Sequence, residues 1–368
     1  MIGKQVYSQN NKTVLFTRAI GIEPGGFPLS LMNGYGNSNL LNDISNLGSM
    51  NPAALENFNK NVIGISYQFW SKFESSLSTN IFYQRINQII PLSIGFAYPL
   101  GNLKIGLSMH QKYNESVSLG PGEYFTSEIK TTDFNYSLTA SYTFPQFLNN
   151  SFITVGFRYG LNNLKYNETY NSASLYGSIY ASDFSAGIVY KLRKEENNYL
   201  QFGLTYESEL SLSKISVWHG GNVFADTEDG RFIEAEDQPI KLNAKFPSTL
   251  RFDIDISTIS KMKILASFSD VYWSLISDYI RNQTELSVSC VYLLNETFSP
   301  SIGFIYINRI YAFELLGPTE IYQNDSFITA GIVIKYRNMN IHFALADGHL
   351  TNPWRKQTVF NTNISYNF

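Results

Sequence analysis

Residues 134–142 read Phe-Asn-Tyr-Ser-Leu-Thr-Ala-Ser-Tyr, so apolar and small polar residues alternate along this stretch. Successive side chains of a β-strand point to opposite faces, and a period of two therefore predicts a strand with two unlike faces. Phe134, Tyr136 and Leu138 fall on the apolar face, while Asn135 and Ser137 fall on the polar face. This stretch indicates a strand that separates two different environments.

The same alternation recurs over most of the chain and predicts fourteen strands. Ile63 and Ile65 oppose Gly64 near the start, and the pattern continues to an aromatic C-terminal residue, Phe368. The predicted strands cover residues 61–70, 88–100, 103–116, 128–144, 151–166, 174–193, 198–216, 246–257, 260–273, 284–294, 298–311, 325–337, 339–348 and 356–368.

The composition of the two faces favours a membrane barrel over a soluble sandwich. One face is rich in Leu, Ile, Phe and Tyr, as a lipid-facing surface requires, and the other in Gly, Ser, Thr and Asn, which suits a wet or plugged lumen. Charged residues make up only 15% of the chain, against about 25% in typical soluble domains. Short turns such as Gly101-Asn102 and Arg337-Asn338 alternate with longer polar loops. The sequence therefore predicts an all-β protein, a transmembrane antiparallel β-barrel in outer-membrane lipid, with its short turns in the periplasm.

Several other classes of protein are disfavoured by composition. The formal net charge is −3 and no concentrated basic face is visible, so nucleic acid is not expected as a partner. The single Cys290 rules out an internal disulfide framework and a multi-thiolate metal site. No Walker A loop, dinucleotide fingerprint or His-Glu-x-x-His occurs, so we expect no cofactor and no metal. Residues 1–18 lack the apolar core of a signal peptide, and export is inferred from the barrel pattern alone.

Residues 1–60 do not alternate and are rich in Gly, Asn, Ser and Pro. Such a segment can lie inside a barrel as a plug, with its backbone groups satisfied by lumen side chains and water. Residues 40–47 are consistent with a short helix in this segment. The sequence thus predicts a lumenal hatch over residues 1–60 and a transmembrane barrel over residues 61–368.

The hatch segment resembles that of the FadL-type outer-membrane transporters of long-chain fatty acids and hydrocarbons. The residues that carry the resemblance are the Gly-rich run 33–37, the run 41–45 (Leu-Asn-Asp-Ile-Ser), and Asn51-Pro52-Ala53-Ala54-Leu55 just before the first strand. The resemblance implies a fourteen-stranded barrel, a hatch in its lumen, and passive uptake of hydrophobic molecules through a lateral opening in the wall. The same superfamily includes accessory barrels of type IX secretion, which are not known to transport solutes.

Asn51, Pro52 and Ala53 are the predicted hatch anchor. Pro52 restricts its own φ and pushes Asn51 towards extended geometry, so the pair can set the angle at which the hatch enters the first strand. Asn51 can add side-chain hydrogen bonds that hold this corner. The simpler reading, a linker turn, remains open.

Charged residues on the predicted inner face are the candidates for lumen chemistry. Asp253 and Asp255 form a carboxylate pair that could in principle activate water, but Arg251 on the same face favours a charge cluster tying the wall to the hatch. Arg158 and Arg309 either hold a substrate carboxylate or serve the same structural purpose. Lys104 and Glu207 are also predicted to face inward, where charge is tolerated.

Two hypotheses about function follow from these observations. The first is a non-enzymatic channel for passive uptake of hydrophobic compounds, whose partners are hydrophobic small molecules. The alternative is an interaction barrel that docks envelope or secreted proteins through its loops, as type IX secretion accessory barrels do. A continuous apolar cavity leading from the external loops to the hatch would favour the channel.

Overall fold

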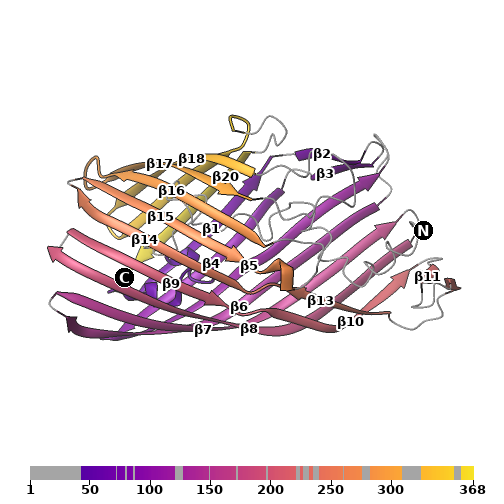
Figure 1. Ribbon diagram of the computed structural model, residues 1–368, viewed down its shortest axis with the longest axis horizontal. Helices are drawn as coiled ribbons and strands as arrows, with labels where there is room; N and C mark the ends of the chain where they lie inside the picture. The colour runs from indigo at the N-terminus through magenta and orange to yellow at the C-terminus, as the bar shows by residue number, and fades with distance from the viewer. Residues whose placement is uncertain are drawn as a thin grey trace.

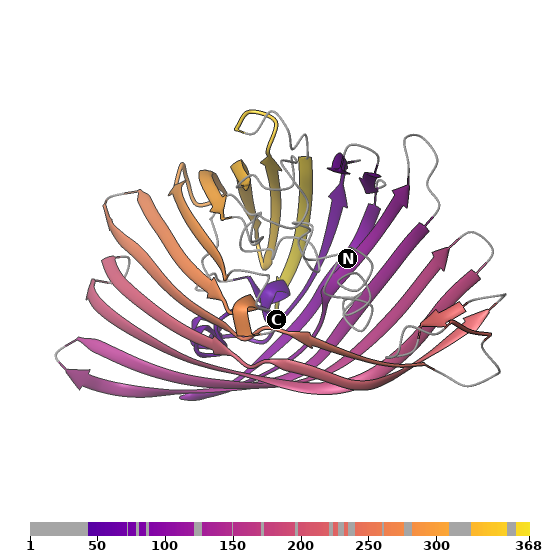
Figure 2. The same ribbon diagram turned by 45° about the vertical axis from the view of Figure 1, so that its right-hand side comes forward.

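The structure is a computed structural model in which the chain forms one closed, tilted β-barrel (Figures 1 and 2). It describes residues 43–71, 73–78, 81–85, 88–120, 127–148, 150–170, 173–195, 198–220, 224–226, 232–234, 240–259, 261–275, 282–308, 325–351 and 358–368. Fourteen antiparallel strands make up the wall, and all fourteen predicted strands have a counterpart in it.

The wall strands follow one another around the barrel nearly in chain order. They are β1 (Val62–Trp70), β4 (Gln88–Leu100), β5 (Leu103–Gly120), β6 (Ser127–Leu148), β7 (Ser151–Tyr170), β8 (Ala173–Glu195), β9 (Asn198–Glu207), β14 (Thr249–Ile259), β15 (Met262–Val271), β16 (Gln283–Tyr292), β17 (Phe298–Ile307), β18 (Asp325–Tyr336), β19 (Met339–Asp347) and β20 (Thr358–Asn367). The sheet closes where β1 pairs with β20, in a register that runs from Val62–Asn367 to Trp70–Val359. Closure leaves the wall without a free edge, as a structure surrounded by lipid requires.

Shorter strands extend the wall at the end that carries the long connections. They are β2 (Phe73–Ser78), β3 (Ile81–Arg85), β10 (Leu210–Gly220) and β13 (Ile240–Phe246). β11 (Phe224–Asp226) and β12 (Phe232–Glu234) pair with each other in a separate two-stranded sheet, and η4 (Trp273–Leu275) follows β15. By the loop-length rule, we assign this end to the cell exterior and the short-turn end to the periplasm.

The two faces of the strands are those that the alternation predicted. Leu107, Leu138 and Phe157 point outward and are about half exposed, whereas Ser137 and Thr139 point inward and are buried. Cys290 lies among the outward-facing positions of β16. The apolar exterior is the surface that lipid would cover.

Two of the predicted strands are divided in the structure. The predicted strand 198–216 breaks between β9 and β10 at Ser208 and Glu209. The predicted strand 246–257 breaks near its start, between β13 and β14, at Pro247 and Ser248. Proline has no backbone N–H to donate to a ladder, which suits a break at that position. Alternation cannot reveal such a break, because the side chains keep their period of two on either side of it.

The β8 ladder is interrupted at the same level. It runs along β9 as far as the pair Ser185–Glu207, and its pairing with β10 begins at Gly177–Val217. Residues 178–184 and 208–216 thus face each other across a weakened part of the wall, where Ser208 still donates its backbone N–H to the carbonyl of Phe184 (2.9 Å).

The described part of the hatch, residues 43–60, lies inside the barrel against several wall strands (Figure 2). It contains two short 3-10 helices, η2 (Ile44–Asn46) and η3 (Pro52–Asn57). The predicted helix over residues 40–47 is therefore represented by η2, and residues 1–42 lie outside the described part of the chain. Apolar hatch residues such as Ile44, Leu47 and Leu55 pack in one buried cluster with wall residues of β1, β4 and β8.

Candidate functional site

Asn51 joins the hatch to the wall through its side chain. Its Oδ1 accepts a hydrogen bond from the N–H of Ala53 (2.9 Å) and so caps η3, with Pro52 in the first turn. Its Nδ2 donates to the backbone carbonyls of Ile188 (3.3 Å) on β8 and Leu204 (3.2 Å) on β9. Asn51 is fully buried. These are contacts of the kind a hatch anchor needs, and its control of passage stays a prediction.

Two wall glycines make room for this corner of the hatch. A Cβ atom on Gly156 of β7 would lie less than 3.0 Å from Pro52 and Ala53, and one on Gly187 of β8 would overlap the Asn51 side chain. The missing side chains let the hatch backbone rest directly on the sheet. At Gly156 and Gly187 the hatch packs directly on the small-residue face that the sequence predicted.

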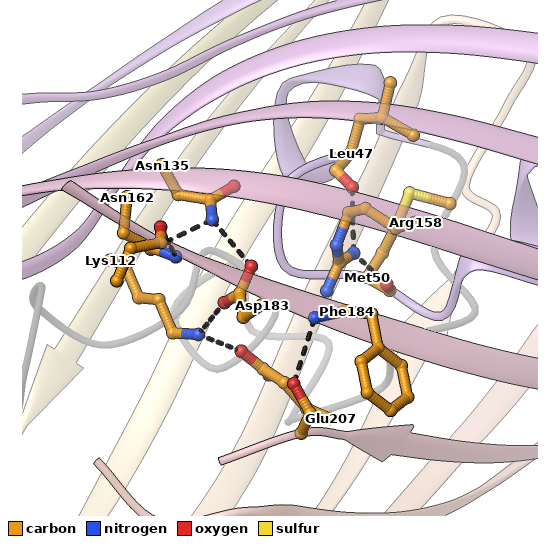
Figure 3. A network of polar contacts seen from close by, with 11 residues as sticks. Leu47, Met50, Lys112, Asn135, Arg158, Asn162, Asp183, Phe184 and Glu207 are labelled. Carbon is orange, nitrogen blue, oxygen red and sulfur yellow. Dashed lines mark hydrogen bonds and ion pairs between the residues drawn. The ribbon is translucent and has the colours of Figure 1, made fainter. Parts of the chain in front are cut away.

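Arg158 of β7 holds the middle of the hatch. Its guanidinium donates hydrogen bonds to the carbonyls of Met50 (2.7 Å) and Leu47 (3.2 Å), and the residue is 5% exposed. Figure 3 shows the side chain directed at the bend between η2 and η3. The structure thus places Arg158 against hatch carbonyls, as expected of a residue that ties wall to hatch.

Asp43 ties the beginning of the described hatch to β19 and β20. Its carboxylate accepts hydrogen bonds from the N–H and hydroxyl of Ser45, caps η2, and lies 3.2 Å from Nδ1 of His342. Asn363 donates to its second oxygen (2.7 Å). Burial alone would raise the pKa of Asp43, but the His342 ring and the Ser45 hydrogen bonds outweigh it and lower the pKa to about 2. The Asp43 carboxylate is therefore ionised at neutral pH.

The far end of the hatch is held by lysines of the wall. Lys104 of β5 donates to the carbonyl of Glu56 and to Oδ1 of Asn59, and Lys191 of β8 lies 3.6 Å from the Glu56 carboxylate. Lys104 faces inward as predicted. The hatch is thus held by polar contacts at its beginning, middle and end.

A charged network covers the inner faces of β5–β9 next to the hatch (Figure 3). Lys112 of β5 forms ion pairs with Asp183 of β8 and with Glu207 of β9. Asn135 of β6 donates to Asn162 (2.9 Å) and to Asp183 (3.1 Å). Glu207 was predicted to face inward; Asp183 could have been found from the alternation of β8. Lys112 continues the inward series of Lys104, Gly106 and Ser108, so the alternation of β5 could have found it too; the β5–β6 register shifts only between Gln111 and Tyr113.

The charged residues of β14 find their partners on neighbouring strands. Asp255 pairs with Lys263 of β15 (2.8 Å) and accepts a hydrogen bond from the Tyr199 hydroxyl (3.4 Å). Arg251 lies 3.9 Å from the carboxylate of Glu285 on β16. Asp253 is fully buried. Arg309 lies outside the described residues.

The inner wall of β17–β20 differs from the charged side because it is apolar towards the exterior end. Inward-facing side chains there form one buried cluster, made of Ile305, Ile307, Phe327, Ala346 and Val359. The described lumen thus has a charged side on β5–β9 and an apolar side on β17–β20. A porin-like aqueous channel has a polar inner surface, so the apolar side of this lumen distinguishes the barrel from such a channel.

Two further observations concern the described residues only. No group of three or more His, Cys, Asp or Glu side chains in them is arranged to hold a metal ion. None of their helices is both long enough and apolar enough to span a membrane.

A closed wall of fourteen strands, apolar outside and filled inside by a seated segment, defines an outer-membrane class of β-barrel with a lumenal hatch. No family model matches the sequence, and a search of curated proteins also finds no match. Solved structures do match along nearly the whole chain, as follows.

A crystal structure of a Pseudomonas aeruginosa FadL homologue is 12% identical, with a TM-score of 0.62 over 94% of this chain and 98% of that one. The toluene transporter TbuX of Ralstonia pickettii is 13% identical, with a TM-score of 0.60 over 92% and 97% of the two chains. The monoaromatic hydrocarbon channel CymD is 12% identical, with a TM-score of 0.61 over 93% and 97%. The chain has the fold of the FadL-type transporters.

Proposed function

We propose that this protein is an outer-membrane channel for the passive uptake of hydrophobic compounds. The observation that carries the proposal is the buried apolar cluster on the inner wall of β17–β20, on the exterior side of the barrel. The cluster is closely packed, at 0–3% exposed, so a hydrophobic solute entering from outside would have to replace contacts that now cover it. Apolar area that the solute itself removes from water is favourable by about 25 cal/mol for each Å². The names of the matching structures, which include transporters of toluene and a monoaromatic hydrocarbon channel, support the same class of solute. Long-chain fatty acids and hydrocarbons are both within the proposed range.

In this proposal the hatch controls passage. Besides its buried apolar cluster, the hatch is held by polar side chains that reach backbone carbonyls, as at Asn51, Arg158 and Lys104. A hydrogen bond of this kind contributes about 1 kcal/mol from a neutral group and about 1.5–3 kcal/mol from a charged one, so a modest number of them can be broken and remade without unfolding the barrel. The chain carries no motif for using nucleotide energy, and the proposed movement is down a gradient.

We place the predicted lateral opening at the interrupted ladder between β8 and β10, next to the hatch. Tethering cysteines introduced at Ser182 and Ser211, two exposed residues on either side of the interruption, should slow uptake. The same tether between Leu138 and Tyr159, which pair across an intact ladder, should have no effect. Equal uptake by both tethered proteins would disprove this route.

The channel itself is tested through Phe327, a fully buried member of the apolar cluster. Phe327→Asn puts an amide into the apolar path, and Phe327→Leu keeps the path apolar. We expect the Asn variant to take up a fluorescent hydrophobic probe about tenfold more slowly in reconstituted liposomes, because the probe loses apolar contact there; tenfold corresponds to about 1.4 kcal/mol, or roughly 55 Å² of apolar area at about 25 cal/mol for each Å². The Leu variant should stay near the unmodified rate. If purified barrels carry no probe whatever occupies this position, the interaction barrel becomes the better hypothesis.

A further inference from the structure

A cavity of about 510 Å³ lies at the short-turn end of the lumen, on the periplasmic side of the hatch. The hatch contributes Phe58 and Lys60 to its lining, and the wall contributes residues of β15–β20, including the β18–β19 turn. The volume is within the range of small-molecule sites, about 300–1,000 Å³. Since hatch and wall both line it, an occupant would contact both.

The cavity carries an excess of positive charge that the protein does not neutralise. Lys60, Lys335 and Arg337 line it, are exposed, and form no ion pair with any residue that the structure describes. Arg337 lies over the Tyr336 ring, 5.3 Å from its centre, and this contact leaves its N–H donors free. The fourth cation, Lys263, is already paired with Asp255.

The one carboxylate that lines the cavity does not offset this charge. Asp43 is 2% exposed and is engaged by Ser45, His342 and Asn363. The Asp43 carboxylate is therefore paired at the contact between hatch and wall. Lys60, Lys335 and Arg337 remain available to bind an anion.

Apolar side chains complete the lining. They are Phe58, Val62, Val291, Leu293 and Val333. Val291 and Val333 also belong to a buried cluster with Leu265 on the inner wall. A small inorganic anion would satisfy the cations and leave this surface uncovered, while a neutral hydrocarbon would do the opposite.

We propose that this cavity binds an amphiphile with a phosphate head group and a single apolar chain. A phosphate monoester carries about −1.5 to −2 charges near neutral pH and three strong acceptor oxygens, which matches three unpaired cations lining one cavity better than one carboxylate does. The planar fork of Arg337 suits two phosphate oxygens at once, and the lysines act as point charges. This site lies on the other side of the hatch from the proposed uptake path, and it does not depend on uptake.

The direct test is equilibrium dialysis of the full-length protein in dodecyl maltoside against dodecyl phosphate, with dodecanol and inorganic phosphate as the single-feature probes. We expect dodecyl phosphate to bind at least about tenfold more tightly than either of the other two. Raising the ionic strength should weaken dodecyl phosphate binding and leave dodecanol unchanged, because exposed charges are screened by salt.

The variants separate the site from general attraction to a basic surface. Lys60→Gln combined with Lys335→Gln should weaken dodecyl phosphate binding about tenfold. Lys261→Gln is the matched control, since Lys261 is an exposed lysine in the β14–β15 turn at the same end and does not line the cavity. Equal losses in the pair and the control, or dodecanol binding as tight as that of dodecyl phosphate, would overturn the proposal.

Two sources of the phosphate can be distinguished in nanodiscs. Discs of phosphatidylcholine alone are compared with discs that also contain phosphatidic acid, whose head group is a phosphate monoester. If phosphatidic acid competes with dodecyl phosphate in the unmodified protein, and not in the double variant, the natural occupant is the head group of a bilayer lipid. If dodecyl phosphate binds equally in both discs, the occupant is a free single-chain phosphate amphiphile. Salt-insensitive binding in both discs would refute an anion site altogether.

Discussion

Replacing Asn51 by Ala should unseat the hatch without unfolding the barrel. The change removes the cap on η3, which contributes about 0.5–2 kcal/mol. It also removes the two hydrogen bonds to Ile188 and Leu204, each of which contributes about 0.5–1.5 kcal/mol. A combined loss of roughly 3 kcal/mol would raise the ratio of unseated to seated hatch about 100-fold.

The expected result is a higher single-channel leak in planar bilayers, with the barrel still resistant to heat on gels. Asn51→Ser is the matched variant, because serine keeps a cap for the Ala53 N–H and is too short to reach the wall carbonyls. Its leak should fall between those of the unmodified protein and Asn51→Ala. An unchanged leak in Asn51→Ala, with an intact barrel, would refute the anchor role and leave this corner as a linker turn.

Three further predictions concern the seat of the hatch, its charge and the lipid face. Gly187→Ala should raise the leak as Asn51→Ala does, because its Cβ overlaps the hatch, while Ala186→Ser, on the outward side of the same strand, should not. The pKa of Asp43 is lowered from 3.8 to about 2 when the hatch is seated. The ionised carboxylate therefore contributes to seating in full above pH 3.8, and this contribution is lost as the pH falls towards 2. The single-channel leak should rise in that window, and an equal rise in Asp43→Asn would exclude Asp43 as the cause. Ile332→Arg should cost the barrel about 2–4 kcal/mol in lipid while Gly331→Ser folds normally, and denaturant titration showing the reverse would contradict the facing of β18.

The sequence alone was enough to predict the wall. A strand alternates its side chains with a period of two whatever surrounds it, so the lipid and lumen faces can be read from residues 134–142 and their repeats. Short and long connections could be counted in the same way. The Asn51-Pro52-Ala53 element also indicated where the hatch meets the first strand.

The partners inside the lumen depended on the tertiary structure. Arg158 lies more than a hundred residues from the hatch carbonyls that it binds, and Asp43 lies about three hundred residues from His342 and Asn363. Asp255 pairs with Lys263, although Arg251 is nearer in the sequence, because the β14–β15 register brings the lysine next to Asp255 in space. Side-chain periodicity reports which face a residue occupies, and only barrel closure and the path of the hatch decide which residues meet across that face.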